Sequence, residues 1–287
     1  MEKSKRYEIS YEQYDRGVTP KDMMDEILSD PELGQLNEII IGCWGDSWDG
    51  GCQEIVDRFV EDADKFSHIE KLFIGDMGYE ECEVSWIIQA DYSRLWAVMP
   101  QLKELTIKGS TDLSLGEICH ENLEALTIIC GGLPHNIFEE LQHAKLPNLR
   151  KLLLYIGVPD YGFDGDETTV KALLDSADFP KLEYLGIVDS EIQDELTRVV
   201  LESRFMDQIH TLDLSCGTLT DKGAELILEK LPKYPKIKTL DLHFHYLSDE
   251  MMARLKNELA DISIDLSEQN EKEVYRGEVW MNAMLTE

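Results

Sequence analysis

Three aliphatic residues with the spacing L-x-x-L-x-L recur along nearly the whole chain. The nine copies are Leu36-Ile39-Ile41, Ile69-Leu72-Ile74, Leu102-Leu105-Ile107, Leu123-Leu126-Ile128, Leu149-Leu152-Leu154, Leu182-Leu185-Ile187, Ile209-Leu212-Leu214, Ile237-Leu240-Leu242 and Leu259-Ile262-Ile264. Their first residues lie 33, 33, 21, 26, 33, 27, 28 and 22 residues apart. A period of this length predicts about nine stacked repeats, each burying its apolar face against its neighbours.

Proline stands at a fixed place before four of these copies. Pro100, Pro147, Pro180 and Pro235 each lie two residues before the first aliphatic residue. Because proline fixes the backbone and ends a helix, this place predicts the turn from a helix into a strand. The copies are therefore predicted to be strands.

The segments between the copies carry aliphatic residues at helical spacing. The predicted helices are Gln53–Phe66, Val84–Val98, Asn136–Ala144, Val170–Ala177, Asp194–Arg204, Asp221–Leu231 and Ser248–Leu259. The repeat that starts at Leu102 is too short for a helix and predicts a 3₁₀ turn or an extended stretch. Alternating strands and helices at this period predict an α/β leucine-rich-repeat solenoid, a right-handed horseshoe with a concave parallel sheet and convex helices.

Both ends of the solenoid differ from the repeats. We predict an N-terminal strand-and-helix cap over residues 1–35, the solenoid over 36–266, and a C-terminal cap or tail over 267–287. In the N-terminal part, Tyr7 and Ile9 alternate with polar residues, and Thr19 with Pro20 forms a helix start. In the tail, the apolar stretch around Trp280 is a candidate cover for the last repeat.

The segment LDLSCGTLTDKGAELILEKLPKYPKIKTLDLHFHYLSDEMMARL, residues 212–255, resembles the ribonuclease-inhibitor class of leucine-rich repeats. The wider chain is similar to a bacterial family of cytoplasmic leucine-rich-repeat proteins. The stretches IGCWGDSWDGG, FIGDMGYEECEVSWIIQADYSRL, CGGLP, YIGVPDYGFDG and LDLHFHYLSDEMM carry this similarity, and the C-terminal VWMNAMLTE departs from it. The resemblance implies the fold, whereas it implies function by analogy alone.

Acidic residues outnumber basic ones by 58 to 27, which gives a net charge of −31. Such a chain repels nucleic acid and anionic lipid, and it attracts basic proteins, unless the acidity serves solubility alone. The six cysteines are scattered and include no CxxC pair, and the N-terminal segment lacks the apolar stretch of a secretory signal. Both features favour a cytoplasmic protein with reduced thiols. No apolar run is long enough to span a bilayer.

The aliphatic triplets point into the core, so the residues between them face the concave side. An apolar patch and an acidic zone are expected there. The predicted protein-binding residues are Phe73, Ile129, Leu153, Tyr155, Tyr184, Val188, Asp213, Asp241, His243, Asp261 and Asp265. An exposed apolar area of this kind marks a contact site, unless loops or the tail cover it and make it core.

Loops that follow strand ends meet at one rim of the solenoid. The predicted rim residues are Trp44, Trp48, Asp76, Tyr161 and Phe163. Aromatic side chains beside carboxylates are typical of binding hot spots. For the two tryptophans, the alternative is that they anchor their own loop by packing.

Enzyme chemistry has weaker signals. His243 and His245 form an H-x-H pair that would share one side of a strand and, with Asp213, Asp241 or Cys216, hold a metal; an ordinary surface pair is the alternative. Neither GDSWDGG nor the glycine pairs match a nucleophile elbow or a phosphate loop. We therefore expect no catalytic residues, metal or cofactor, and a module that binds a basic protein. The rivals are a metal-dependent enzyme that uses rim carboxylates with both histidines, and a self-assembling scaffold.

Overall fold

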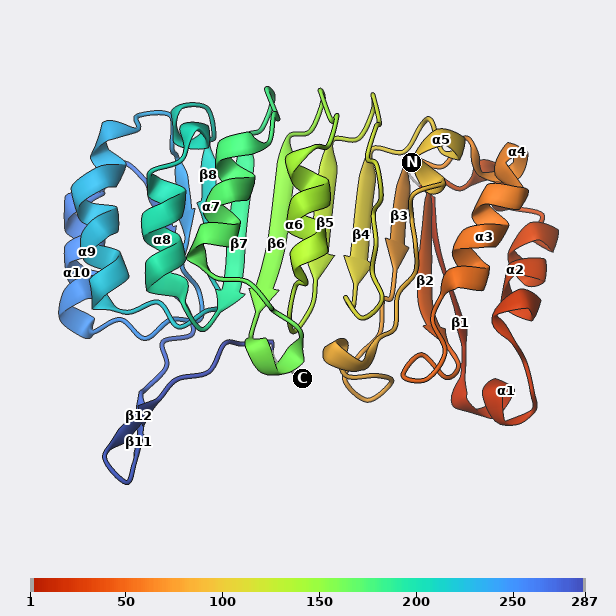
Figure 1. Ribbon diagram of the computed structural model, residues 1–287, viewed down its shortest axis with the longest axis horizontal. Coiled ribbons are helices and arrows are strands. Elements are labelled where there is room, and N and C mark those ends of the chain that lie inside the picture. The colour runs from red at the N-terminus through yellow and green to blue at the C-terminus, as the bar shows by residue number, and fades with distance from the viewer. Residues whose placement is uncertain (1–2, 286–287) are drawn as a thin grey trace.

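The computed structural model describes residues 3–285, for Tyr275 the backbone alone. Ten parallel strands form one sheet, and neighbours in the chain are neighbours in the sheet (Figure 1). They are β1 (Ser4–Ile9), β2 (Glu38–Trp44), β3 (Lys71–Ile74), β4 (Glu104–Lys108), β5 (Ala125–Ile129), β6 (Lys151–Gly157), β7 (Tyr184–Ser190), β8 (Thr211–Asp213), β9 (Thr239–Asp241) and β10 (Ser263–Asp265). This is a leucine-rich-repeat-like α/β solenoid.

Helices connect the strands and lie on one side of the sheet (Figure 1). The α-helices are α1 (Tyr11–Asp15), α2 (Pro20–Ser29), α3 (Gln53–Glu61), α4 (Ala63–Phe66), α5 (Leu95–Val98), α6 (His135–Gln142), α7 (Glu167–Ser176), α8 (Gln193–Leu201), α9 (Asp221–Lys230) and α10 (Asp249–Glu258). Short 3₁₀ turns are η1 (Leu33–Gln35), η2 (Val84–Trp86), η3 (Pro159–Tyr161), η4 (Arg204–Asp207) and η5 (Leu231–Lys233). Within residues 3–285, no helix is both long and apolar enough to cross a membrane.

The core lies between the sheet and the helices. Leu72 and Ile74 of β3 are buried beneath the helices, whereas Lys71 and Phe73, which alternate with them, keep part of their surface exposed. The same alternation holds in β4, β5 and most of β6. Each buried Leu or Ile contributes roughly 1.5–3 kcal/mol, so the triplets hold the repeats together. We call the other side of the sheet the open face.

The N-terminal segment extends the sheet and covers its first edge. β1 pairs with β2 in parallel, with Tyr7 and Ile9 buried as expected. The predicted helix start is confirmed: Thr19 accepts from the backbone N–H of Asp22 at 3.3 Å, and Asp22 accepts from that of Thr19 at 2.8 Å. Met23, Met24 and Ile27 of α2 close the core at this end.

Most predicted helices are confirmed within two or three residues at each end. The helix predicted over Val84–Val98 is wrong: η2 and α5 stand at its ends, and the chain between them is extended and bridges to the next repeat through Ile88 with Thr111 and Asp91 with Ser114. Bridging gives these backbone groups partners that a helix would have supplied. The stretch between β4 and β5 contains no helix, as expected.

The tail leaves the last repeat as a projecting hairpin, β11 (Glu273–Tyr275) with β12 (Glu278–Trp280) (Figure 1). Its apolar stretch does not cover the last repeat, because Trp280 is 54% exposed. Residues 282–285 instead return along the strand ends. There the Met284 N–H bonds to the Cys216 carbonyl at 2.8 Å, and the Leu285 N–H bonds to Asp189 Oδ1 at 2.8 Å.

Candidate functional site

The open face changes character along one row of in-register residues. This row is Phe73, Thr106, Thr127, Leu153, Gly186, Asp213, Asp241 and Asp265, one residue from each of β3 to β10. It is apolar or neutral up to Gly186 and acidic after it. We call Asp213, Asp241 and Asp265 the aspartate row.

The predicted apolar residues of the open face extend from Phe73 on β3 to Tyr184 on β7, next to the aspartate row. Phe73, Ile129, Leu153, Tyr155 and Tyr184 are all partly exposed, and we call them the apolar patch. The expectation that Val188 faces water is wrong, because this side chain is 1% exposed. Val188 lies beside Tyr155 in the register, and the adjoining Asp189 lies under the returning tail, so this end of β7 is covered.

Tyr184 connects the apolar patch to the aspartate row. Its hydroxyl donates a short hydrogen bond to Asp213, which also accepts from the Ser215 hydroxyl at 2.6 Å. Gly186 lies beneath the ring, where an added Cβ would lie 3.2 Å from Tyr184 Cε1. The Lys151 ammonium lies 4.8 Å from the centre of the ring, a cation–π distance.

Asp213 is nearly buried, contrary to the expectation of a solvent-facing carboxylate, because it is 5% exposed. Burial raises the pKa of Asp213 and the charge of Asp241 adds to this, whereas the hydrogen bonds from Ser215 and Tyr184 lower it. The charge available to a partner therefore lies more on Asp241 and Asp265 than on Asp213.

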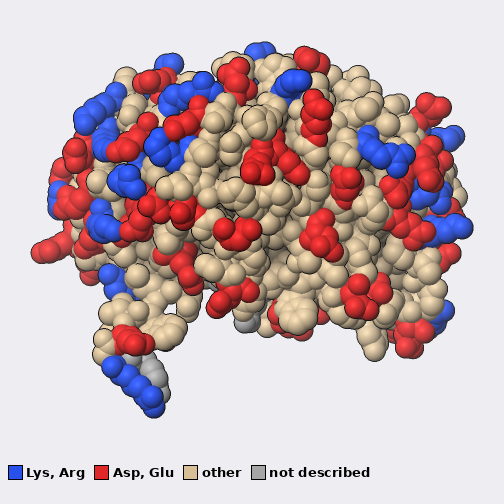
Figure 2. All heavy atoms as spheres, viewed as in Figure 1, with Lys and Arg blue, Asp and Glu red and all other residues tan. Residues whose placement is uncertain are grey.

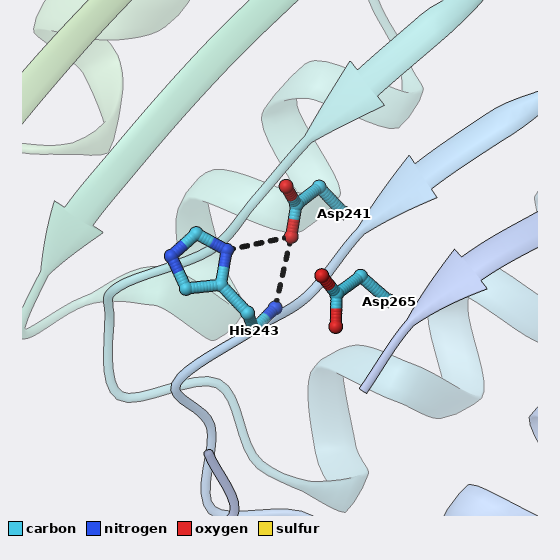
Figure 3. Close-up of side chains that lie close together, drawn as sticks. All are labelled: Asp241, His243 and Asp265. Atoms are coloured by element: carbon cyan, nitrogen blue, oxygen red, sulfur yellow. Dashed lines mark hydrogen bonds and ion pairs between the residues drawn. The ribbon is translucent and has the colours of Figure 1, made fainter. Parts of the chain in front are cut away.

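Asp241 and His243 form the best-defined pair of the acidic zone. Asp241 Oδ1 lies 2.7 Å from His243 Nδ1 and also accepts from the His243 backbone N–H at 3.0 Å (Figure 3). Burial lowers the pKa of His243, but the hydrogen bond and charge of Asp241, with the charges of Asp213 and Asp265, raise it above its ordinary value overall. The Asp265 carboxylate lies beside the pair, from the neighbouring strand (Figure 3).

The second ring nitrogen of His243 meets a cysteine. Cys216 Sγ lies 3.2 Å from His243 Nε2, so thiol, imidazole and carboxylate follow one another as in a nucleophile with its base. This thiol is 1% exposed, and burial raises the pKa of Cys216 to about 12, so it is a protonated, covered group. The left-handed backbone of Cys216 recurs at Asp189, Phe244 and Glu268, the equivalent residues of other repeats, so it reflects the repeat geometry.

The expected histidine pair does not form one site. β9 ends at Asp241, and Phe244 adopts a left-handed conformation between the two histidines, so they do not share a side of a strand. His245 is fully buried, with Nε2 at 3.2 Å from the Leu266 carbonyl and Nδ1 at 3.2 Å from the Leu247 nitrogen. Both of its ring nitrogens therefore have structural partners.

The last repeat is shifted by two residues from its predicted register. Ile264 pairs with Leu240, and Asp265 pairs with Asp241. Asp261 is exposed and precedes β10, so it does not belong to the aspartate row. In the observed register Ile264 stands beside Leu240, and Ile262, Ile264 and Leu266 all pack against the core.

The predicted rim residues divide between packing and exposure. Trp44 is buried and donates its indole N–H to the Gly50 carbonyl at 2.9 Å, so it anchors its loop, and Phe163 is buried against Phe138. Trp48 is 44% exposed, with its ring edge-on to Tyr14. Asp76 bonds to Arg6 at 2.9 Å, and Tyr161 is half-buried. Trp48, Asp76 and Tyr161 therefore remain accessible at the rim.

One titratable residue of this region was not foreseen. Asp189 is fully buried under the returning tail, its Oδ2 has no hydrogen-bond partner, and burial raises the pKa of Asp189 to about 8. A signal existed in the sequence. Seven residues after the first aliphatic, Cys43, Cys130, Ile156 and Cys216 are apolar and buried, whereas Asp76 at the same place is partly exposed, so the signal for Asp189 was partial.

Comparisons with known proteins extend the picture. A crystal structure of a Bacteroides fragilis protein superposes on this chain with a TM-score of 0.89 and 43% sequence identity, over 98% of this chain and 77% of that one. The crystal structure of Listeria monocytogenes InlP matches with a TM-score of 0.37 and 16% identity, over 79% of this chain and 64% of that one. No protein-family model matches, and no curated protein is similar in sequence. On the identity and coverage of the first match, the chain belongs to the same family as the Bacteroides fragilis protein.

Proposed function

We propose that this chain is a protein-binding module that holds a basic partner on its open face and the adjoining rim. One observation carries the proposal: a partly exposed apolar patch lies directly beside an aspartate row that has no lysine or arginine partner among residues 3–285. Apolar and aromatic contact area supplies affinity, and unpaired charge at its side supplies orientation and a fast encounter.

The arrangement of the sheet supports this use. Side chains of the open face come from ten strands held by one core, so they form a rigid surface that needs little ordering when a partner binds. On the side drawn in Figure 2, basic side chains lie among the acidic ones mainly toward the two ends of the solenoid. On the open face, the aspartate row offers a basic partner carboxylates that no lysine or arginine of residues 3–285 pairs with.

We further propose the finer features expected from the sequence: a right-handed horseshoe with a concave open face, ribonuclease-inhibitor-like repeats, and a cap, solenoid and tail with the stated boundaries. We also propose a bacterial cytoplasmic location, which the six free cysteines support, and a binding rather than catalytic role. The covered, protonated Cys216 thiol and the structural role of His245 support the non-enzymatic role.

Affinity capture with matched baits tests the proposal. The parent chain and a Phe73→Ala/Asp241→Asn variant are immobilised, and proteins retained from a lysate of the source cell are compared at low and high salt. We expect a basic protein that the parent retains at low salt and the variant does not. A Lys222→Ala variant on α9, exposed on the helix side, is the control and should retain it. Capture that is equal with all three baits would refute the open face as the binding surface.

A further inference from the structure

The aspartate row places like charges opposite each other without a counter-ion. Asp213, Asp241 and Asp265 are register partners on three adjacent strands, which lie about 4.8 Å apart. Like charges directly opposite each other in a sheet are destabilising. Within residues 3–285, hydroxyl groups of Tyr184, Ser215 and Ser267 donate to Asp213 and Asp265, and the basic group that pairs with the row is the His243 ring on Asp241. A bound cation would therefore offset the repulsion between these carboxylates.

The donor atoms at the outer end of the row suit one kind of cation. Asp241, His243 and Asp265 each offer a ligand atom, and these three atoms lie within 4.8 Å of one another (Figure 3). Ca²⁺ and Mg²⁺ prefer oxygen ligands, whereas an imidazole nitrogen with carboxylates suits transition metals. The nitrogen donor sets this group apart from the other acidic clusters of the surface.

We propose that Asp241, His243 and Asp265 bind one divalent transition-metal ion of the Zn²⁺ type. The ligands are one carboxylate oxygen from each aspartate and Nδ1 of His243. Three protein ligands leave at least one coordination position to water, on the open side of the sheet. Binding replaces the repulsion between two facing carboxylates with attraction of both to the metal.

The surroundings of His243 are compatible with ligation through Nδ1. A ligating imidazole carries its proton on the other nitrogen, and here that nitrogen lies 3.2 Å from Cys216 Sγ, a weak acceptor. Without metal, Nδ1–H donates to Asp241 Oδ1. Metal binding therefore moves the ring proton from Nδ1 to Nε2. The fixed backbone N–H bond from His243 to Asp241 keeps both ligands in place during this exchange.

Titration of the metal-free chain with Zn²⁺ tests the site without any partner protein. The full chain is treated with a chelator, and Zn²⁺ binding is followed by calorimetry with millimolar Mg²⁺ and Ca²⁺ present. We expect one ion per chain, and a loss of affinity of at least about tenfold in His243→Gln and in Asp265→Asn. The matched control is His135→Gln, which removes an exposed histidine 3.5 Å from Glu139 on α6 and should not change the affinity.

A second readout separates a coordinated ion from general attraction to an acidic surface. Nitrogen NMR of the histidines should show His243 change from the Nδ1–H to the Nε2–H tautomer at one equivalent of Zn²⁺. Circular dichroism and melting of each variant check that the fold is intact. Equal Zn²⁺ affinity in the parent and both ligand variants, several weak ions per chain, or displacement by Ca²⁺ would each overturn the proposal. Such a result leaves the proposed partner binding untouched, because the titration contains no partner protein.

Discussion

The first and the last strands of the sheet differ in how the charges on the open face are paired. At β1 to β4, opposite charges pair: Arg6 bonds to Asp76 at 2.9 Å and approaches Glu81 at 3.4 Å, and Lys71 lies 3.1 Å from Glu104. At β8 to β10, the aspartate row faces itself, with His243 as its one charged partner among the described residues. The charges of the first strands stabilise the chain, whereas those of the last strands remain available to something else.

Local sequence explains the difference. Gly42 on β2 has no side chain, and a Cβ added there would lie 2.7 Å from Arg6 Nη2, which is too close. The glycine therefore lets Arg6 reach across β2 to the end of β3. Gly186 on β7 plays a similar part for the Tyr184 ring, but this ring delivers a hydroxyl and no charge to Asp213. A functional site is expected where charges of one sign lie together and no opposite charge in the chain compensates them.

The comparison predicts that neutralising a buried acid near the last strands stabilises the protein. Asp189→Asn should show the largest effect. Because the pKa of Asp189 rises from 3.8 to about 8 on burial, the folded state holds a proton that the unfolded state has lost. This contribution to stability is complete below about pH 4 and is lost as the pH rises toward 8, at about 1.4 kcal/mol per pH unit. Asn keeps the acceptor for Leu285 and tolerates the left-handed backbone at this position.

Denaturant unfolding at pH 5 and pH 8 measures this effect. The variant should exceed the parent in free energy of unfolding by several kcal/mol at pH 8 and by much less at pH 5. Asp64→Asn, an exposed change on α4, should track the parent at both values. A variant less stable than the parent at pH 8 would show that Asp189 is ionised and stabilising, contrary to the comparison.

A smaller loss is expected for Tyr184→Phe. This change removes the hydroxyl that donates to the nearly buried Asp213 and keeps the ring over Gly186 and beneath Lys151. An acceptor left short of a donor costs about 1–3 kcal/mol. Thermal or denaturant unfolding should show that loss, whereas Tyr11→Phe, whose ring is exposed on α1, should show none. Equal stability of parent and Tyr184→Phe would mean that Ser215 alone satisfies Asp213.

Much of the fold could be predicted because the repeat signal is distributed over nine copies. The triplets placed the strands, and the helix predicted over Ser248–Leu259 appears as Asp249–Glu258. The helix over Val84–Val98 could not be excluded, because its aliphatic spacing fits a helix and an extended repeat connection equally well. The last register shifts although Asp261 interrupts the triplet: Ile264 and Leu266 also fit the second and third places of the pattern, and pairing with β9 selects them.

The site was less predictable, because its properties depend on what covers it. Alternation placed Phe73, Leu153 and Asp241 on the open face, and the structure places them there. Alternation does not reveal that the tail returns to Asp189, or that β9 ends before His245. Such contacts join residues up to 96 positions apart, and they follow from the path of the tail rather than from local pattern.

The aspartate row should also govern how fast a basic partner associates. Asp241→Asn with Asp265→Asn should slow association by about two- to tenfold at low ionic strength and flatten its dependence on salt, because exposed charges are screened within about 8 Å under physiological conditions. The measurement is made with EDTA present, so that metal binding does not contribute. Glu54→Gln with Glu61→Gln on α3 changes the net charge equally on the other side and should leave the rate nearly unchanged. An unchanged salt slope would show that the acidity serves solubility alone.

The smallest expected effects test the comparison most directly, because the two substitutions should change the free energy of unfolding in different directions. Glu104→Gln removes one partner of Lys71. Since the side chains of Glu104 and Lys71 are 49% and 25% exposed, the loss should be about 0–1 kcal/mol and should shrink as salt is added. Asp213→Asn removes a charge that burial and the charge of Asp241 disfavour, since both raise the pKa of Asp213, and it should leave stability unchanged or slightly raised. Unfolding of both variants at two ionic strengths, in EDTA, decides the matter. If both changes destabilise the protein to the same extent, the last strands balance their charges as the first strands do. The aspartate row is then not a set of uncompensated charges that a partner could use.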